Sequence, residues 1–236
     1  MSGGAPQLAL DLRWDRACEL DSYVATDGGA VLAAVRAAAA GSATPVLLYG
    51  APGSGKSHLL QAACSAAHGG GRAAVYLRLA EARAAMTPEV LEGLEGLGLV
   101  ALDQWEAVAG ERAWEEALLH CFNRCRESGA SLLMAARRRP ADLGLRLPDL
   151  VSRLQWGLVL RLAVLDDPGR RQALALRAQR RGLDLPRETL DYLLTRESRD
   201  PAHLFGLLER LDRASLAAGR RLTVPFVRQV LARREE

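Results

Sequence analysis

The chain has 236 residues, of which 49% are hydrophobic and 25% are charged, and its formal net charge is +3. This length fits one or two domains with a substantial core, and the weakly basic balance permits contact with nucleic acid without requiring it. No apolar run approaches the roughly 18 residues of a membrane span, and the opening MSGGAPQLALDLRWD lacks the pattern of a signal peptide, so we expect a cytoplasmic protein without membrane contact. The scattered cysteines Cys18, Cys64, Cys121 and Cys125 indicate buried thiols rather than a zinc site.

The first 13 residues are predicted to be a flexible tail, because they are too short to form a core of their own. Apolar leucines alternate along it, which is typical of an extended peptide bound in the groove of a partner. A first strand, or a strap on the domain itself, fits the same alternation, and the residues leave both interpretations open. The segment concerned is Gln7, Leu8, Ala9, Leu10, Asp11 and Leu12.

Residues 14–165 are predicted to alternate between strands and helices. Alternation of this kind is typical of an α/β domain with a parallel sheet and helices on both faces. The fold class is therefore a five-stranded parallel sheet in a nucleotide-binding α/β domain. We expect strands at 46–49, 73–79, 97–103, 131–136 and 158–162, with helices at 29–40, after the loop at 50–57, from 87, at 111–128 and at 150–156.

Beyond Leu165 the pattern changes to helices alone. Four helix starts carry the Asp or Pro residues that favour a first helical turn. Residues 166–236 are therefore predicted to form a small α-helical lid domain. The starts are Asp166-Asp167-Pro168, Pro186-Arg187-Glu188, Asp200-Pro201 and Thr223-Val224-Pro225.

The strongest motif is GAPGSGKS at residues 50–57, a full match to the phosphate-binding P-loop. Its glycines let backbone N–H groups turn toward an anion, and the helix that follows adds its dipole. Lys56, the one lysine of the chain, would reach the β- and γ-phosphates, and the Ser57 hydroxyl would bind Mg²⁺. The predicted nucleotide-binding residues are Gly50, Ala51, Pro52, Gly53, Ser54, Gly55, Lys56, Ser57 and His58.

A second acid is predicted at the end of the strand LVALD. Asp103 fits the carboxylate that holds Mg²⁺ through water in P-loop enzymes. Many related ATPases carry another carboxylate next, but here the residue is Gln104, whose amide can orient water without accepting its proton. We therefore expect slow hydrolysis by this chain alone. Glu106 could replace the missing carboxylate only if the backbone bends suitably.

Two arginine features follow the fourth predicted strand, at 131–136. Arg153, within LVSRLQWG, stands where oligomeric P-loop ATPases place an arginine that reaches the neighbouring subunit's nucleotide. A surface arginine paired with Asp149 fits these residues as well, and both interpretations stay open. We expect Trp156 to pack in the core. The run Arg137–Arg139 indicates a solvated patch or a contact with DNA phosphates.

The succession of the P-loop, LVALDQWEAVAG, RRRPADL, LPDLVSRLQWG and a four-helix lid resembles the DnaA-type AAA+ family, and within it the Hda regulators of DnaA. The resemblance covers nearly the whole chain and implies an AAA+ P-loop NTPase core. It implies that residues 7–12 bind the DNA polymerase III sliding clamp (beta subunit). Arg153 would act in trans as an arginine finger on ATP held by the initiator DnaA, so the chain would be a nucleoid-associated negative regulator of replication initiation. DNA is then reached through the clamp, and weak direct contact and a homodimer stay open.

The chain departs from the family pattern at three places around the γ-phosphate. Gln104 follows the strand acid, Ala135-Ala136-Arg137 replaces a polar triplet, and Ala202 stands where a lid arginine is expected. These departures imply that ADP (or ATP) with Mg²⁺ is held mainly by its α- and β-phosphates as a structural ligand. The alternative is a DNA-remodelling ATPase or helicase loader of the DnaA/DnaC type that uses its own ATP. A nucleotide kinase is disfavoured, because no acceptor-binding insertion is present.

Overall fold

The computed structural model describes residues 18–197 and 201–232, without the side chains of residues 201 and 202. The predicted clamp-binding segment, residues 7–12, therefore lies outside the described residues. Within the described part, no helix is long and apolar enough to cross a membrane. All four cysteines are buried, as predicted.

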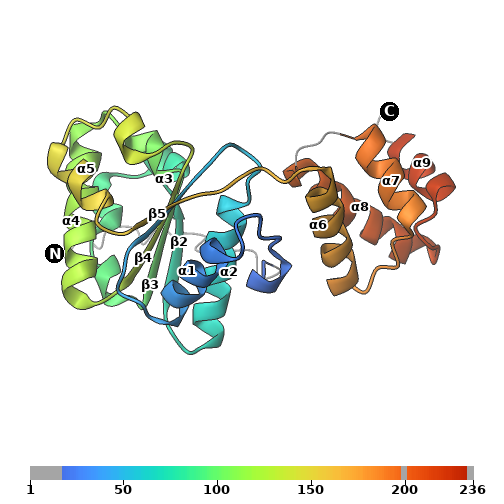
Figure 1. Cartoon of the computed structure of the whole chain (residues 1–236), viewed down its shortest axis with the longest axis horizontal. Coiled ribbons are helices and arrows are strands. Elements are labelled where there is room, and N and C mark those ends of the chain that lie inside the picture. Colours follow the sequence, from blue (N-terminus) through green and yellow to red (C-terminus); the bar gives the residue numbers. More distant parts are fainter. Residues whose placement is uncertain (1–17, 198–200, 233–236) are drawn as a thin grey trace, which may run out of the picture.

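Five parallel strands form one sheet in the order β2-β3-β4-β1-β5 (Figure 1). The central strands β3 and β4 are buried along their whole length, which agrees with their unbroken apolar runs. Because β1 lies next to β4, the carboxyl ends of these two strands meet at one edge of the sheet. The strands are β1 (Val46–Tyr49), β2 (Ala74–Arg78), β3 (Leu99–Asp103), β4 (Ser131–Ala136) and β5 (Leu158–Arg161).

Helices cover both faces of the sheet (Figure 1), as the alternation predicts. One face packs against α1 (Ala30–Ala40) and α2 (Lys56–Gly69). The other packs against α3 (Leu79–Ala85), α4 (Arg112–Ser128) and α5 (Pro148–Leu154). The connections contain short 3-10 helices: η1 (Leu20–Ser22), η2 (Pro88–Leu91), η3 (Leu94–Gly96), η4 (Trp105–Val108) and η5 (Pro140–Asp142).

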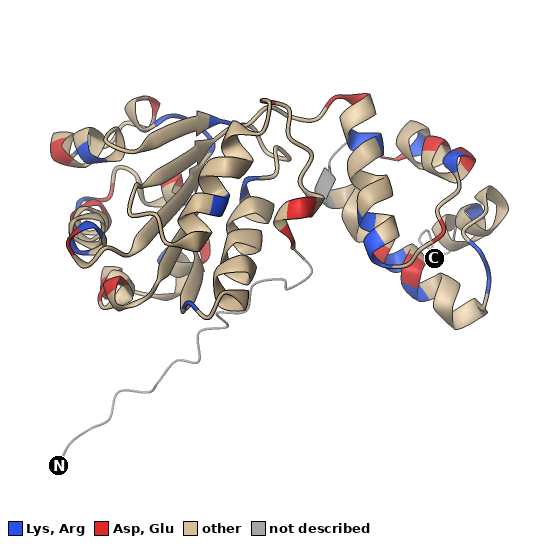
Figure 2. Cartoon of the chain, turned by 60° about the horizontal axis from the view of Figure 1, so that its bottom comes forward, with Lys and Arg blue, Asp and Glu red and all other residues tan. Residues whose placement is uncertain are grey.

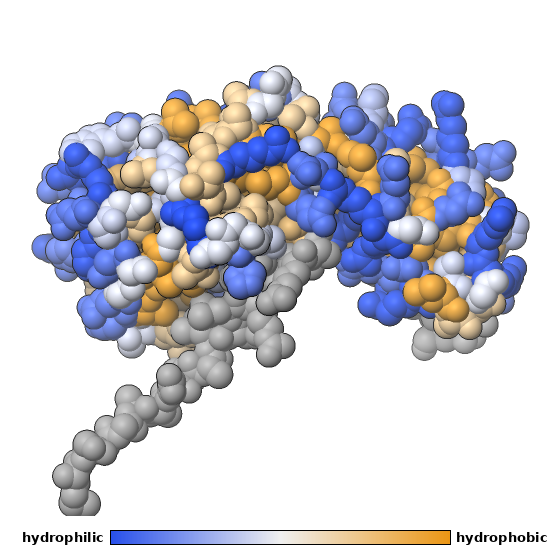
Figure 3. All heavy atoms as spheres, turned by 90° about the horizontal axis from the view of Figure 1, so that it is seen from below, coloured by the Kyte–Doolittle hydropathy of each residue, from blue (hydrophilic) through white to orange (hydrophobic). Residues whose placement is uncertain are grey.

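The C-terminal helices form a second lobe beside the α/β core (Figure 1). They have hydrophobic clusters of their own, and Figure 2 shows charged residues of both signs along these helices. In the space-filling view, hydrophobic surface continues from the core lobe across the junction (Figure 3). The predicted α/β core with a five-stranded parallel sheet and a helical lid is thus confirmed, with α6 (Asp167–Arg180), α7 (Arg187–Arg196), α8 (Pro201–Ala218) and α9 (Val224–Ala232).

Candidate nucleotide-binding site

The P-loop connects the end of β1 to the start of α2 at the carboxyl edge of the sheet. Gly53 and Gly55 have φ of 76° and 90°, which is the left-handed region that glycine adopts without strain. The Lys56 ammonium donates to the carbonyl oxygens of Gly50 at 2.7 Å and Ala51 at 2.8 Å. Burial lowers the pKa of Lys56, whereas the nearby carboxylates oppose that shift. The loop is thus folded around its lysine.

Asp103 is held rigidly at the end of β3, with only 1% of its surface exposed. Its Oδ2 accepts a hydrogen bond from the Tyr76 hydroxyl at 2.7 Å, and its Oδ1 accepts one from the Gln104 backbone N–H at 2.9 Å. Burial, reinforced by Asp103, raises the pKa of Tyr76, so the phenol stays a donor. Tyr76 lies on the neighbouring strand β2, and no sequence motif singled it out.

A cavity of about 280 Å³ lies over the loop. It brings together most of the predicted phosphate-binding residues, the strand acid and one residue of the lid. Gly50 and Ala51 line an adjacent cavity with Arg137–Arg139 and Arg161, and Ser54 lines a third. The lining residues are Pro52, Gly53, Gly55, Lys56, Ser57, His58, Asp103, Gln104, Glu106, Ala136, Arg137 and Phe205.

These residues fit a nucleotide with Mg²⁺. The loop leaves room for phosphate oxygens, because Gly53 and Gly55, whose positive φ favours glycine, place no side chain over it. Among the described residues, no cluster of three or more His, Cys, Asp or Glu side chains could hold a metal by itself. Ser57 and Asp103 line the same cavity, and their hydroxyl and carboxylate oxygens fit an ion that takes its other ligands from phosphate and water, as Mg²⁺ does.

A second, mostly apolar cavity joins the core to the lid. Its walls suit a flat purine ring, since aromatic and aliphatic side chains surround it. Sequence reasoning missed its non-P-loop residues, because they come from distant segments that only the tertiary fold brings together. They are Ser22 at the end of η1, Tyr23 and Val24 directly after it, Leu165 before the lid, Ala173 and Arg177 of α6, and Phe205 of α8.

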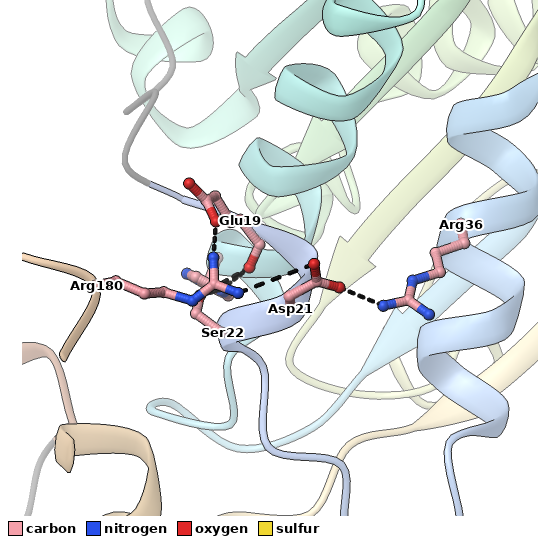
Figure 4. Close-up of polar contacts among 6 residues, drawn as sticks. Glu19, Asp21, Ser22, Arg36 and Arg180 are labelled. Atoms are coloured by element: carbon pink, nitrogen blue, oxygen red, sulfur yellow. Dashed lines mark hydrogen bonds and ion pairs between the residues drawn. The ribbon is translucent and has the colours of Figure 1, made fainter. Parts of the chain in front are cut away.

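The segment at η1 is tied to both the P-loop helix and the lid (Figure 4). His58 Nε2, on α2, lies 3.1 Å from the Ser22 hydroxyl and 3.2 Å from the Glu19 carbonyl oxygen. Arg180 of α6 pairs with Glu19 and lies 3.9 Å from Asp21, which also accepts from Arg36 of α1. His58, predicted to bind nucleotide, thus also anchors the segment that contacts the lid.

Arg153 lies in the last turn of α5, outside the lining of both cavities. Its guanidinium carbon is 3.9 Å from the centroid of the Trp156 ring, and that of Arg126 is 4.6 Å from the same ring. Within the described part it forms no ion pair with Asp149 or another carboxylate. The prediction that Trp156 packs in the core is wrong: the residue is 53% exposed, and it precedes the edge strand β5, whose own residues are exposed or half-buried.

Glu115 of α4 fixes the approach to α5, a role that no motif revealed. It is fully buried, and its carboxylate accepts hydrogen bonds from the backbone N–H groups of Gly110, Arg146 and Leu147 at 2.6, 2.8 and 2.9 Å. Leu147 directly precedes α5. One buried carboxylate thus holds the segment that leads into the helix of Arg153.

A P-loop on this strand order, with a helical lid beside it, defines the AAA+ class of P-loop domains. The chain belongs to the bacterial DnaA ATPase domain family, whose model matches residues 20–161. Residues 167–231 match the lid domain of Hda. The chain is thus DnaA-related over its core and Hda-like in its lid.

Solved structures share this fold. Domain III of the Thermotoga maritima replication initiation protein DnaA is similar with a TM-score of 0.74 and 21% identity, over 93% of this chain and 98% of that one. A replication initiator DnaA bound to AMPPCP and single-stranded DNA is similar with a TM-score of 0.69 and 24% identity, over 83% of this chain and 65% of that one. The T. maritima RuvB Holliday junction branch migration motor is similar with a TM-score of 0.65 and 17% identity, over 92% of this chain and 73% of that one. This chain therefore spans about two thirds of the length of the DNA-bound initiator.

Proposed function

We propose that this chain is an ADP-holding AAA+ regulator that represses replication initiation by stimulating hydrolysis of ATP bound to the initiator DnaA. Residues 50–58 hold the nucleotide, and Ser57 and Asp103 hold Mg²⁺. Arg153 supplies the arginine finger in trans. The proposal is supported by the family matches of the DnaA-type core and the Hda-type lid, and by the position of Arg153.

The observation that carries the proposal is the placement of Arg153. Its guanidinium has no carboxylate partner in the described part of the chain and lies outside its own nucleotide cavity. The exposed Trp156 ring supports it from one side. An arginine finger stabilises the charge that develops on a transferring γ-phosphate, and a guanidinium on the surface can do so only in a neighbouring subunit.

The residues of this chain's own site favour binding of a nucleotide over hydrolysis of ATP. The amide of Gln104 lines the phosphate cavity where a carboxylate would activate water. Ala136 also lines it and offers no hydrogen bond to a γ-phosphate. ADP is therefore the nucleotide we assign, with its α- and β-phosphates on the loop.

The remaining parts of the chain complete a bridge between two partners. The tail, residues 1–13, binds the DNA polymerase III sliding clamp through Gln7–Leu12, so DNA is contacted through the clamp. The proposed domains are this tail, the nucleotide-binding domain at 14–165 and the lid at 166–236. This arrangement brings the regulator to DNA-bound DnaA at the nucleoid.

Arg153→Ala tests the proposal most simply. In a mixture with DnaA, ATP and clamp-loaded DNA, the wild-type chain should accelerate ATP hydrolysis. The stimulated rate should be about 10³-fold lower with the variant. Arg196→Ala, which removes another exposed arginine from the end of α7, is the matched control and should retain the activity. Undiminished stimulation by Arg153→Ala would refute the finger.

A further inference from the structure

The backbone bends sharply after β3. Gln104 has φ of 54° and is the single non-glycine residue with positive φ in the described part. The bend leads directly into η4, where the Trp105 side chain is fully buried and Glu106 follows. As a result, Glu106 lines the phosphate cavity together with Lys56 and Arg137. The bend on which replacement of the missing carboxylate by Glu106 depends is therefore present, but here the Glu106 carboxylate is paired with Arg137.

The Glu106 carboxylate is only half satisfied. Its Oε1 lies 3.4 Å from Arg137 Nε, and its side chain is 16% exposed. Its Oε2 is buried without a partner at hydrogen-bond geometry, although backbone N–H groups of Glu106 and Arg137 lie near enough to lower its pKa. Burial outweighs them and raises that pKa above its ordinary value. Burial of a carboxylate oxygen without a hydrogen-bond partner costs free energy, so the position of Glu106 in this cavity needs an explanation.

The charges around the cavity form an ordered set. Lys56 and Arg137 are positive, whereas Asp103 and Glu106 are negative, and all four line the same space. Of the two acids, Asp103 accepts hydrogen bonds from Tyr76 and the Gln104 N–H through its two oxygens. Glu106 is therefore the acid that has an oxygen without a hydrogen-bond partner. A diphosphate on the loop uses Lys56 and the backbone, but a third phosphate adds negative charge to a space that already contains two carboxylates.

We propose that Glu106, with Arg137 as its counter-ion, selects ADP over ATP in this chain's own site. The carboxylate repels the additional charge of a γ-phosphate, and Arg137 limits that repulsion. This inference rests on the proposed function, in which the chain holds ADP, and it assigns the preference to one residue. Because the two side chains have opposite charges, their removal should shift the preference in opposite directions.

Isothermal titration of the full chain with Mg·ADP and with Mg·AMPPCP, which is not hydrolysed, tests this role. Glu106→Gln should bring the ratio of the AMPPCP and ADP dissociation constants down about tenfold, since it removes one unit of charge and keeps the shape. Arg137→Gln should raise that ratio. Glu116→Gln, which removes an exposed α4 carboxylate paired with Arg112, is the matched control and should leave it unchanged.

The outcomes separate this inference from the function on which it rests. Suppose that the wild-type chain binds both nucleotides and that Glu106→Gln leaves the ratio of the AMPPCP and ADP dissociation constants unchanged or raises it. This result would overturn the role of Glu106 but not the proposed function. A raised ratio would indicate that the carboxylate serves the triphosphate, through a water on the metal. If the wild-type chain binds neither nucleotide, the proposed function fails with it. A purely structural role for Glu106 would weaken both nucleotides equally, and the ratio would again stay constant.

Discussion

At the scale of single residues, the position of Arg153 depends on an aromatic ring that is exposed to solvent. The guanidinium carbons of Arg153 and Arg126 lie 3.9 and 4.6 Å from the centroid of the Trp156 ring. Stacking of this kind stabilises a cation by about 0.5–1 kcal/mol at an exposed site. The ring thus restricts the orientations of a side chain that has no carboxylate to hold it in the described part of the chain.

Trp156→Ala should therefore weaken the stimulation of DnaA's ATPase without abolishing it, by about two- to fivefold. Trp156→Phe keeps an aromatic face and should restore most of the activity. Leu216→Ala removes an exposed apolar side chain from the lid, 77% accessible in the structure, and serves as the control in the same assay. Equal activity of the Ala and Phe variants would argue against a positioning role for the ring.

The residues of the site differ in how far the sequence could predict them. The P-loop is a continuous motif whose chemistry depends on local spacing, so Lys56 and Asp103 could be placed from the sequence alone. Tyr76, Tyr23 and Phe205 could not, because each reaches the site from another element. The exposure of Trp156 was missed because an aromatic residue before a strand usually packs inward, whereas β5 is an edge strand.

At the scale of elements, α5 depends on a buried contact from α4. Glu115 accepts three backbone hydrogen bonds, from Gly110 and from the two residues that precede α5. Because Glu115 itself is fully buried, its carboxylate depends on these N–H groups for its hydrogen bonds. The helix bearing Arg153 is thus fixed at its start by a carboxylate and at its end by the turn through Trp156.

Glu115→Gln should lower the free energy of unfolding by about 2–3 kcal/mol, because an amide presents donors to groups that are themselves donors. The neighbouring Glu116→Gln changes an exposed side chain and should stay within about 0.5 kcal/mol of the wild type. Urea unfolding followed by circular dichroism measures both. Indistinguishable midpoints for the two variants would show that the buried carboxylate contributes nothing to stability.

Most elements could be predicted from periodicity and end signals, since β4 and α7 follow unbroken patterns between clear stops. The seven-residue helix α3 could not, because it continues from β2 without a glycine or proline to mark its start. The region predicted as a helix from residue 87 forms the short 3-10 helix η2 instead. The strand order also lies beyond the sequence, since it depends on how the crossovers pack.

At the scale of the whole molecule, an ion pair and an apolar cavity connect the lid and the core. Arg180 of α6 pairs with Glu19 beside η1 (Figure 4). The apolar cavity is lined by residues of both lobes. The tail precedes this same segment in the chain. The proposed bridge therefore runs from the clamp, through the tail, to a nucleotide-stabilised body that presents Arg153.

The bridge predicts that clamp binding and finger activity are separable. The double variant Gln7→Ala, Leu8→Ala should abolish capture of the chain by immobilised clamp, because the side chains that would fill the groove are removed. Its thermal unfolding midpoint should match that of the wild type. Arg153→Ala should bind the clamp normally in the same capture experiment. Retained capture of the double variant would contradict the assignment of the tail.

The most direct test of the account asks whose ATP is hydrolysed. DnaA is loaded with ATP labelled at the γ-phosphate, this chain with unlabelled ADP, and release of labelled phosphate is followed in a single turnover on clamp-loaded DNA. We predict rapid release with the wild-type chain and release at the rate of DnaA alone with Arg153→Ala. Rapid release with Arg153→Ala, or release only when the label is carried by this chain, would contradict the account.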